Sequence, residues 1–398
     1  MDRHAHLKPQ QPKMQDYVSR SQTIFIVAGQ AASLVNFRLP LLQRFRALGF
    51  EVHACAPALS EDEATAQVLE KNGIFMHDVP FERAGMNPLS DLRAARVLYR
   101  TMRSTRADIV LSYTVKPVIW GTLAAAVAGI PQRVALITGL GYAFTGKTRG
   151  KRQLVRRVLF GLYRKALRHA DHVFFQNPDD AAEFREQGLL TSGASVSVVN
   201  GSGVDLDRFA STPLPPVSGP VRFLLIARML GDKGIREFAV AAGRIKATHP
   251  DVQFDLVGGT DANPDSIPSS TLRTWETEKG VAWHGSQMDV RPFLSACHVY
   301  VLPSYREGTP RSVLEAMATG RAIITTDAPG CRETVIPGVN GFLVPPHNAQ
   351  ALEQAMRRFL EEPGLIQVMG TESLRIVREK YDVKRVNEQM LADMGLTK

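Results

Sequence analysis

The chain has 398 residues, of which 44% are hydrophobic and 22% are charged. This balance is typical of a soluble α/β protein and excludes a fibrous or disordered chain. The length exceeds what one ordinary core accommodates and predicts two or three domains. The three cysteines are scattered and form no CxxC pair, so we expect no disulfide framework, no zinc ribbon and a reducing compartment. No apolar run of about 18 residues occurs, which predicts no transmembrane helix.

The net charge of +9 is concentrated in the first half of the chain. Residues 1–200 contain 26 Lys and Arg against 16 Asp and Glu, a net charge of +10, whereas residues 201–398 contain 22 against 23, a net charge of −1. A basic half indicates an anionic partner, which is a nucleic acid, an anionic lipid or a phosphorylated substrate. The alternative is that the positive charge reflects no anionic partner at all, because basic proteins are common.

Short apolar runs alternate with helical patterns after a polar start. Residues 1–22 have no apolar core and are predicted to form a disordered tail rather than a signal peptide. Strand-like runs then recur at residues 23–28, 51–56, 109–112, 134–137 and 172–176. This alternation predicts a parallel sheet covered by helices on both faces.

A proline-rich segment interrupts the alternation. Residues 211–220 contain four prolines, which suit neither a helix nor a central strand, so we interpret them as a linker. The alternation restarts over residues 221–375 and predicts a second doubly wound domain after the first, residues 23–210. Residues 376–398 are expected to form a helix that crosses back to the first domain. Such sheets bind ligands at the carboxyl ends of their strands, so we expect the site in the cleft between the domains.

The strongest chemical signal is the segment VYVLPSYREGTPRSVLEAMATG, residues 299–320. Glu307 lies in the loop after an apolar strand, and Glu315 lies eight positions later, inside the next helix. Thr309 is a suitable N-cap, and Pro310 suits the first helical position. Free N–H groups at this helix start are able to bind a phosphate, and a carboxylate accepts hydrogen bonds from a ribose diol. Either glutamate alone is more simply a solvated surface charge; the pair in this frame is more specific.

The segment FLLIARMLGDKG, residues 223–234, places two cations at the end of another strand. Arg228 follows the strand, Lys233 lies five positions further on, and Gly234 opens a helix. Breaking a sugar–phosphate bond leaves negative charge on the leaving group, which cations in this position stabilise. The two residues are therefore candidate diphosphate ligands; the alternative is a pair of surface cations.

In these two segments the chain resembles the retaining GT-B glycosyltransferases of family 4, whose E-x7-E motif matches Glu307 to Glu315. The resemblance implies an α/β fold with two Rossmann-like doubly wound domains facing a cleft. It implies acceptor binding by the first domain and nucleotide-sugar binding by the second. It assigns catalytic roles to Arg228, Lys233 and Glu307.

The same resemblance implies how the donor is held. Glu315 is expected to bind the nucleotide ribose, and Glu307 to contact hydroxyls of the transferred sugar. Further donor ligands are expected at Gly29, Gly258, Gly308, Thr309, Pro310 and Ser312. No DxD-like acidic pair ends a strand, and the family is usually metal-independent, so we expect no metal and no other cofactor.

Three strand ends of the first domain are expected to face the cleft. Residues 29–36 (GQAASLVN) form a small-residue loop but not a GxGxxG fingerprint, which disfavours a dinucleotide-binding protein. The strand end SYTVK, residues 112–116, lacks the histidine that related enzymes often carry there. The third strand end is TGLGYAFT, residues 138–145. Candidate acceptor or cleft residues at the second and third strand ends are Tyr113, Lys116, Thr138 and Gly139.

Residues 147–169 carry many cations and no acid. Apolar residues recur at helical spacing from Leu154, opposite a basic face, so this helix is able to lie on an anionic bilayer. The alternative is an ordinary helix whose apolar stripe packs on its own sheet. The proposed membrane face comprises Arg156, Arg157, Phe160, Arg164 and Lys165. We therefore expect a cytoplasmic protein, peripheral at the inner face of the plasma membrane.

The strings YTVKPVIWG, ITGLGYAFTG, FQNPDD and PGCRETVIPGVNGFLVP resemble bacterial enzymes that extend lipid-linked glycans for O-antigen, capsule or exopolysaccharide. These include α-1,3-N-acetylgalactosaminyltransferases that act on undecaprenyl-diphosphate sugars. The resemblance implies transfer of a hexosyl group, such as N-acetylgalactosamine, from a UDP-sugar to a lipid-linked saccharide.

Two other functions remain open from the residues. A non-hydrolysing UDP-sugar epimerase can share the two-domain architecture, but it needs no acceptor. A basic membrane- or nucleic-acid-binding protein without catalysis would use the charged first half. No helix-turn-helix, RRM or zinc signature is present, so we expect no nucleic-acid partner.

Overall fold

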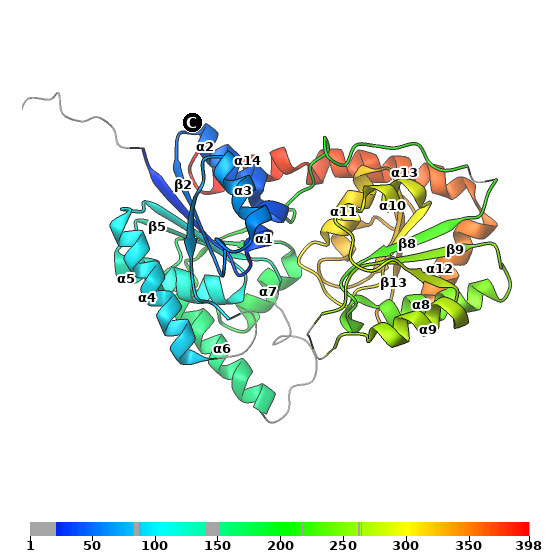
Figure 1. Ribbon diagram of the computed structural model, residues 1–398, viewed down its shortest axis with the longest axis horizontal. Helices are drawn as coiled ribbons and strands as arrows, with labels where there is room; N and C mark the ends of the chain where they lie inside the picture. Colours follow the sequence, from blue (N-terminus) through cyan, green and yellow to red (C-terminus); the bar gives the residue numbers. More distant parts are fainter. Residues whose placement is uncertain are drawn as a thin grey trace, which may run out of the picture.

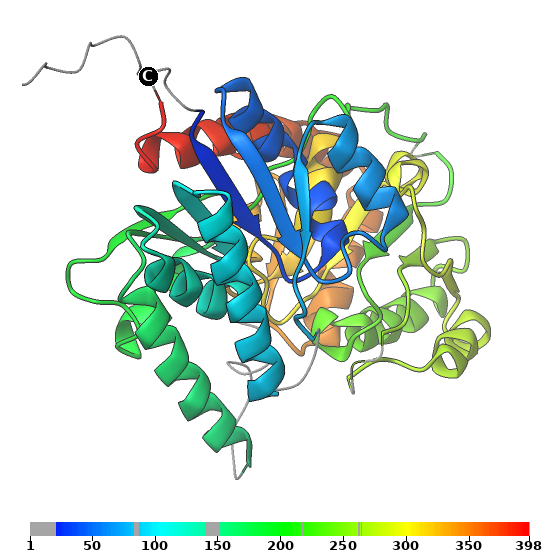
Figure 2. The same ribbon diagram turned by 60° about the vertical axis from the view of Figure 1, so that its left-hand side comes forward.

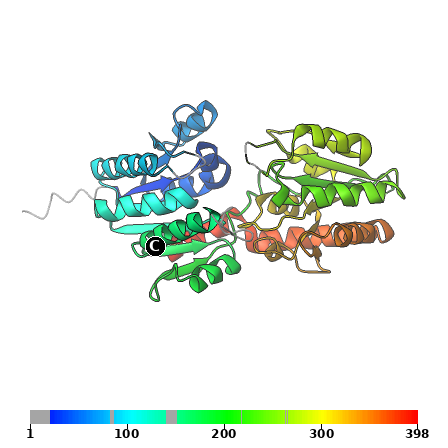
Figure 3. The same cartoon turned by 90° about the horizontal axis from the view of Figure 1, so that it is seen from below.

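The computed structural model describes residues 21–82, 87–139, 151–216, 218–261, 263 and 265–397. Two parallel sheets, each with helices on both faces, form two side-by-side domains (Figures 1 and 3). The predicted α/β architecture of two Rossmann-like domains is therefore confirmed. The disordered tail predicted for residues 1–22 lies almost wholly outside the described residues and stays a prediction.

The first sheet has seven parallel strands in the order β3-β2-β1-β4-β5-β6-β7. The strands are β1 Thr23–Val27, β2 Glu51–Ala56, β3 Phe75–Asp78, β4 Ile109–Tyr113, β5 Gln132–Ile137, β6 His172–Phe175 and β7 Ser195–Val198. The helices are α1 Ala31–Ser33, α2 Leu39–Ala47, α3 Glu63–Lys71, α4 Pro88–Ser104, α5 Thr122–Ala128, α6 Lys151–Leu167 and α7 Pro178–Glu186, with π-helices Leu34–Arg38 and Pro117–Gly121. Central strands such as β1 are buried along their whole length, which explains their continuous apolar sequence.

The second sheet has six parallel strands in the order β10-β9-β8-β11-β12-β13. The strands are β8 Arg222–Ile226, β9 Gln253–Val257, β10 Val281–Trp283, β11 Val299–Leu302, β12 Ala322–Thr326 and β13 Gly341–Val344. The α-helices are α8 Ile235–Lys246, α9 Ser269–Glu278, α10 Arg291–Ala296, α11 Arg311–Ala318, α12 Ala349–Glu361, α13 Gly364–Ile376 and α14 Val383–Asp393. Shorter turns are the 3-10 helices Gly231–Lys233 and Arg332–Thr334 and the π-helix Val377–Tyr381.

Helix α14 belongs in space to the first domain, although it follows the second in sequence. Met390, Leu391 and Met394 are buried in the same core cluster as strands β1 and β2. Figure 1 shows α14 beside α2, and the two helices are in contact. The chain therefore passes between the domains twice.

The two passages lie against each other. Val204 donates its N–H to the carbonyl of Tyr381 at 2.8 Å, and Val383 donates to the carbonyl of Val204 at 3.0 Å. Gly203 has φ +66°, and a Cβ there would lie 2.6 Å from Cα of Val383. Only glycine combines this backbone conformation with so close an approach.

The proline-rich segment predicted as a linker follows the first passage. Its start is fixed to the second domain by Arg321, whose guanidinium donates to the carbonyls of Thr212 at 2.8 Å and Pro213 at 3.2 Å. Arg321 is fully buried, and its guanidinium N–H groups donate hydrogen bonds to backbone carbonyls. No helix of the described residues is both long enough and apolar enough to cross a bilayer.

Candidate active site

A cleft of about 940 Å³ lies between the two domains. Residues from the carboxyl ends of strands in both sheets line it, as expected for doubly wound domains. Tyr113 and Thr138 stand on the first domain's wall, and Arg228, Gly258 and Glu307 on the second domain's wall. The cleft therefore brings together most of the residues singled out from the sequence.

Lys233 and Glu307 form an ion pair in this cleft. Their Nζ and Oε1 atoms are 2.6 Å apart, and both side chains are mostly buried. Burial lowers the pKa of the Lys233 ammonium, but the Glu307 carboxylate outweighs burial and leaves that pKa raised. Lys233 is consequently a permanent cation, and Glu307 is oriented by it.

Glycines allow the loops of the second domain to approach closely enough for this pair to form. Gly234 has φ +68°, and a Cβ there would lie 2.1 Å from the carbonyl oxygen of Pro303, in the loop after β11. Gly258 has φ +145°, and its Cβ would lie 1.8 Å from the carbonyl oxygen of Ala227. Both positions exclude any side chain. Gly258 thus acts in the packing beneath the cleft as well as lining it.

Arg228 has a different environment from Lys233. Its side chain is 56% exposed and pairs with Asp261 at 2.9 Å. It lines the cleft and is free to reorient toward a bound anion. The sequence did not single out Asp261, which lies 33 positions from Arg228.

Glu315 is mostly buried on α11 and pairs with Arg311 one turn earlier, with Nε and Oε1 2.9 Å apart. Burial raises the pKa of the Glu315 carboxyl, and Arg311 offsets this only in part. Arg311 and Ser312 line the cleft with Glu315. Arg311 was not predicted, although its i, i+4 spacing to Glu315 was visible in the sequence.

The predicted cap of α11 is wrong by one residue. The helix begins at Arg311, and Pro310 occupies the N-cap position with φ −72° and ψ 108° and no side-chain cap. The Thr309 hydroxyl instead donates to the carbonyl of Gln176 in the first domain, at 2.8 Å. The contact between domains therefore outweighs local capping at this helix.

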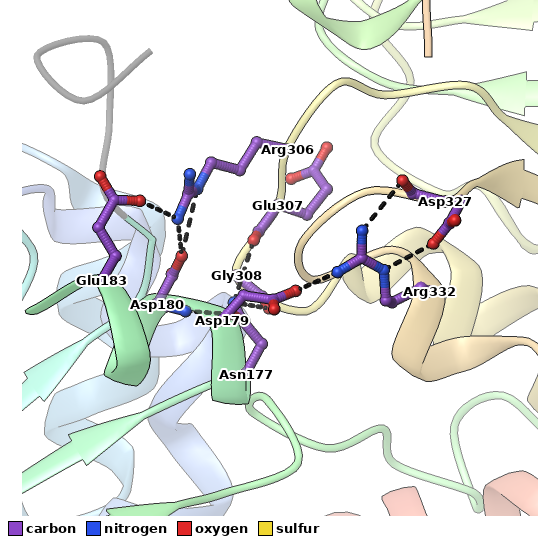
Figure 4. A network of polar contacts seen from close by, with 9 residues as sticks. All are labelled: Asn177, Asp179, Asp180, Glu183, Arg306, Glu307, Gly308, Asp327 and Arg332. Atoms are coloured by element: carbon purple, nitrogen blue, oxygen red, sulfur yellow. Dashed lines mark hydrogen bonds and ion pairs between the residues drawn. The ribbon is translucent and has the colours of Figure 1, made fainter. Parts of the chain in front are cut away.

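Asn177 and its neighbours tie the first domain to the Glu307 loop (Figure 4). The Asn177 side chain caps α7 by accepting from the N–H of Asp180 at 2.8 Å. Its Nδ2 donates to the carbonyls of Gly308 at 2.9 Å and Glu307 at 3.3 Å. Gly308 leaves no room for a side chain, because its Cβ would lie 2.3 Å from the carbonyl oxygen of Thr138.

Two arginines of the second domain extend this network onto α7. Arg306 contacts Asp180 at 2.5 Å and Glu183 at 3.0 Å. Arg332 contacts Asp179 at 2.6 Å and, within its own domain, Asp327. Asp180 is fully buried, and burial raises the pKa of its carboxyl despite the side chain of Arg306. The string FQNPDD indicated a resemblance to enzymes that extend lipid-linked glycans, but it did not predict that Asp179 and Asp180 contact the second domain.

The first domain's wall holds the predicted acceptor residues. Tyr113 is buried, and its hydroxyl lies 2.8 Å from that of Ser33. Lys116 lines the cleft but is paired with Asp91 of α4 at 2.9 Å. Gly29 also lines the cleft and is packed against the Thr114 side chain.

Thr138 and Gly139 lie beside the Gly308 backbone. A Cβ on Gly139 would lie 3.6 Å from the backbone nitrogen of Gly308. The rest of the predicted strand end, residues 140–145, lies outside the described residues.

Comparison with known proteins decides the family. Residues 37–200 match the glycosyl transferase 4-like domain, and residues 220–362 match the glycosyl transferases of group 1. The chain is 32% identical over 345 residues to the N,N'-diacetylbacillosaminyl-diphospho-undecaprenol alpha-1,3-N-acetylgalactosaminyltransferase of Campylobacter jejuni, a match that covers 84% of this chain and 88% of that protein. The chain is a family 4, group 1 glycosyltransferase.

Other similar proteins agree with this family. The glycosyltransferase is 26% identical over 333 residues to the UDP-Gal:alpha-D-GlcNAc-diphosphoundecaprenol alpha-1,3-galactosyltransferase of Escherichia coli, covering 80% of this chain and 84% of that protein. Its fold matches sucrose-phosphate synthase from Thermosynechococcus elongatus, with TM-score 0.77 and 20% identity over 93% of this chain and 97% of the other. It also matches HepE from Anabaena in complex with UDP, with TM-score 0.74 and 19% identity over 94% and 100% of the two chains. The predicted GT-B fold is confirmed.

The predicted membrane face of the glycosyltransferase lies on α6, which projects from the first domain (Figure 2). The last turns pack on the sheet through Tyr163 and Leu167. In the first turns, the apolar stripe is instead exposed: Leu154 is 65% exposed, and Val155 and Val158 are also exposed. The alternative that the stripe packs on its own sheet therefore holds only for the end of the helix.

Two residues of the predicted membrane face have structural contacts. Arg164 donates to the carbonyls of Gly188 at 2.8 Å and Gln187 at 3.2 Å, which fastens α6 to the end of α7. Phe160 is half-buried against the core beneath α6 and lies under the guanidinium of Arg156, 4.9 Å from the ring centroid. These contacts engage the Arg164 guanidinium and half-bury Phe160, and the expectation that both residues face lipid stays a prediction. Arg157 and Lys165 are exposed.

Proposed function

We propose that this glycosyltransferase moves an N-acetylhexosaminyl group, in particular N-acetylgalactosamine, from a UDP-sugar to a saccharide carried on undecaprenyl diphosphate. The product would be an intermediate of a bacterial surface glycan such as O-antigen, capsule or exopolysaccharide. The observation that carries the proposal is the buried Lys233–Glu307 pair beside Arg228 in the cleft between the domains. The names of the Campylobacter jejuni and Escherichia coli relatives support the donor and acceptor classes.

The donor's charges match the second domain's wall. In this proposal Arg228 and Lys233 bind the UDP diphosphate, and Glu315 accepts hydrogen bonds from the ribose hydroxyls. Arg228 is exposed in the cleft and exchanges Asp261 for a phosphate oxygen. These cations stabilise the charge that develops on the leaving diphosphate, which is the role a magnesium ion plays in other transferases. We therefore propose metal-independent transfer.

The proposed transfer retains the anomeric configuration. The bond between the sugar's anomeric carbon and the phosphate oxygen breaks, and its electron pair goes to the UDP phosphate. The acceptor hydroxyl forms the new bond on the same face and passes its proton to that phosphate oxygen. Glu307, already held by Lys233, positions the donor sugar's hydroxyls and takes no proton. Tight positioning of this kind lowers the barrier without a side-chain nucleophile.

The lipid acceptor requires the enzyme to reach a membrane, and α6 suits that task. Its exposed Leu154, Val155 and Val158 lie on the same projecting turns as Arg156 and Arg157. Apolar insertion combined with cations favours an anionic bilayer surface. We propose peripheral attachment at the inner face of the plasma membrane through these turns.

A donor panel with a defined acceptor tests the proposed function. The enzyme is incubated with each UDP-sugar and a polyprenyl-diphospho-N-acetylhexosamine, UDP release is recorded, and the product's mass and anomeric configuration are determined. We expect UDP release that requires the acceptor and is greatest with UDP-N-acetylgalactosamine. Conversion of a UDP-sugar without any acceptor would instead support an epimerase, and absence of a saccharide product with every donor would overturn the proposal.

A further inference from the structure

Arg38 is a buried cation on the first domain's wall. It ends the π-helix Leu34–Arg38, directly before α2. Pro40 explains this irregular turn, because proline has no N–H for the carbonyl of Asn36, and its ring crowds that carbonyl. The side chain lines the cleft although only 2% of the residue is exposed.

The charge of Arg38 has no carboxylate partner within the described part of the chain. Its Nε is buried and has no hydrogen-bond acceptor. The guanidinium carbon lies 5.1 Å from the centroid of the Tyr113 ring, a weaker cation–π contact. Burial lowers the pKa of Arg38 to about 10; Tyr113 raises it in part, and Arg311 lowers it further. A buried charge in this state destabilises the free protein.

Three other cations of the cleft are each paired with an acid. Lys116 is paired with Asp91 and Lys233 with Glu307. Arg311 is paired with Glu315. Arg38 lies near Arg311 and, among the residues that the structure describes, has no acid to balance it, so an anion entering here would be stabilised by a buried charge that no carboxylate neutralises. The planar guanidinium suits two phosphate oxygens at once.

We propose that Arg38, with the Tyr113 ring behind it, binds the diphosphate of the lipid-linked acceptor. This subsite rests on the proposed function. The donor diphosphate already has Arg228 and Lys233 on the opposite wall, whereas Arg38 belongs to the first domain. In the acceptors that the two relatives' names describe, the sugar that receives the new residue is itself joined to the diphosphate. The diphosphate must then lie one sugar ring from the attacked hydroxyl, inside the cleft.

Two acceptors that differ only in the diphosphate test this subsite. One is a polyprenyl-diphospho-N-acetylhexosamine, and the other is the same sugar as an uncharged alkyl glycoside. The variants are Arg38→Met, which keeps the length without charge, and Arg38→Lys, which keeps charge without the planar fork. Arg44→Met serves as the matched control, because Arg44 lies nearby on α2 and pairs with Glu388 outside the cleft.

We expect Arg38→Met to raise KM for the diphosphate acceptor about 10- to 100-fold, the range of a lost charge-assisted hydrogen bond. The KM values for the UDP-sugar and for the uncharged acceptor should stay unchanged. Arg38→Lys should lie between wild type and Arg38→Met. The melting temperature of Arg38→Met should not fall, since the substitution removes an unpaired buried charge. Arg44→Met should behave as wild type.

A binding measurement makes the test independent of turnover. Geranylgeranyl diphosphate, added with saturating UDP so that the donor subsite is filled, should raise the melting temperature of wild type but not of Arg38→Met. Equal stabilisation of both proteins overturns the subsite.

Further outcomes contradict the proposal. Equal loss with the two acceptors, or a lower melting temperature, assigns Arg38 a structural role. A rise in KM for the UDP-sugar alone assigns it to the donor diphosphate. If the wild-type enzyme has the same KM for the diphosphate acceptor and for the uncharged acceptor, the subsite is overturned but the transferase function is not. A wild type that uses neither acceptor overturns the proposed function, and the subsite falls with it.

Discussion

Lys233 and Glu307 are 74 positions apart in the chain, yet their side chains meet at 2.6 Å in the cleft. They come from the loops after β8 and β11, which are neighbouring strands of the second sheet. The contact joins the cation expected to bind the donor's diphosphate to the carboxylate expected to hold its sugar. A change in either residue should therefore affect both functions.

Lys233→Ala should lower kcat by on the order of 100- to 1000-fold, because a cation at the leaving group is lost. Turnover of UDP-sugar in steady state is the measurement. The variant leaves Glu307 without its partner, so Lys233→Met/Glu307→Gln, which removes both charges, serves as the folding control. Lys246→Ala, on the exposed face of α8, should retain full activity. Near-normal activity of Lys233→Ala contradicts the assignment.

UDP affinity should fall at mildly acidic pH. Burial raises the pKa of Glu315, so this carboxylate becomes protonated at a higher pH than an ordinary glutamate and then accepts poorly from the ribose. Calorimetric titration with UDP over a pH series should show this loss, and Glu315→Gln should bind weakly with a flatter profile. An unchanged profile in Glu315→Gln excludes Glu315 as the titrating group.

The same raised pKa has an opposite effect on stability. Between the ordinary glutamate pKa and the raised pKa, the folded state binds more protons than the unfolded state. The Glu315 contribution is therefore present at low pH and is lost as pH rises through the raised pKa. Urea unfolding of wild type and Glu315→Gln over that range should show a steeper decline for wild type; parallel curves contradict the prediction.

Asn177 should act as a positioning residue for Glu307. Asn177→Ala removes the donor to the Glu307 and Gly308 carbonyls and also the cap of α7, which costs about 1 kcal/mol. Asn177→Asp keeps the cap and loses only the donor, so it isolates the effect on the loop. We expect Asn177→Asp to lower kcat while the affinity for UDP stays unchanged. Equal kcat in Asn177→Asp and wild type leaves Asn177 with the capping role alone.

Asp180→Asn should weaken the contact between the domains. It removes the buried charge that Arg306 faces, and breaking a buried pair costs about 3 kcal/mol. Unfolding in urea should report that loss. Glu183→Gln is the milder comparison, because Glu183 is partly exposed and meets the same Arg306. If Asp180→Asn is no less stable than Glu183→Gln, the buried pair does not stabilise this arrangement.

Binding to vesicles should depend on the exposed cations of α6. Replacing Arg156, Arg157 and Lys165 with Gln should weaken binding to anionic vesicles about 100-fold, since each near-surface cation contributes about 1 kcal/mol. Arg164 is left intact because it fastens α6 to α7. Co-sedimentation at two salt concentrations is the measurement.

Two further variants separate charge from insertion. Leu154→Asn/Val155→Asn/Val158→Asn should reduce binding with little change in its salt dependence. Replacing the second domain's exposed cations Arg244, Arg291 and Arg375 should have no effect. If this control set weakens binding as strongly, net charge rather than α6 explains the attraction.

The alternation of strands with helices and the pair of motifs could be predicted from the sequence, because apolar runs and residue spacing are local properties. The cap of α11 could not, since Thr309 is used by Gln176 of the other domain. Arg306 and Asp180 are 126 positions apart, and nothing local distinguishes them from surface charges. In the sequence, Arg38 is one more cation of the basic first half; only the structure shows that it is buried and that its Nε has no hydrogen-bond partner among the described residues. Likewise, the sequence could not separate the exposed start of α6 from its packed end.

The double passage of the chain at Gly203 restricts how the enzyme can open. Val204 is hydrogen-bonded to the returning backbone at Tyr381 and Val383. The two segments that connect the domains are therefore held together as one narrow connection. We therefore expect any opening of the cleft to be chiefly a rotation about this connection, with little sliding of one domain along the other. We expect such a rotation to bring the Glu307 loop back to the same contacts with Asn177 and Asp180, so that closure would restore one arrangement of the two walls of the cleft.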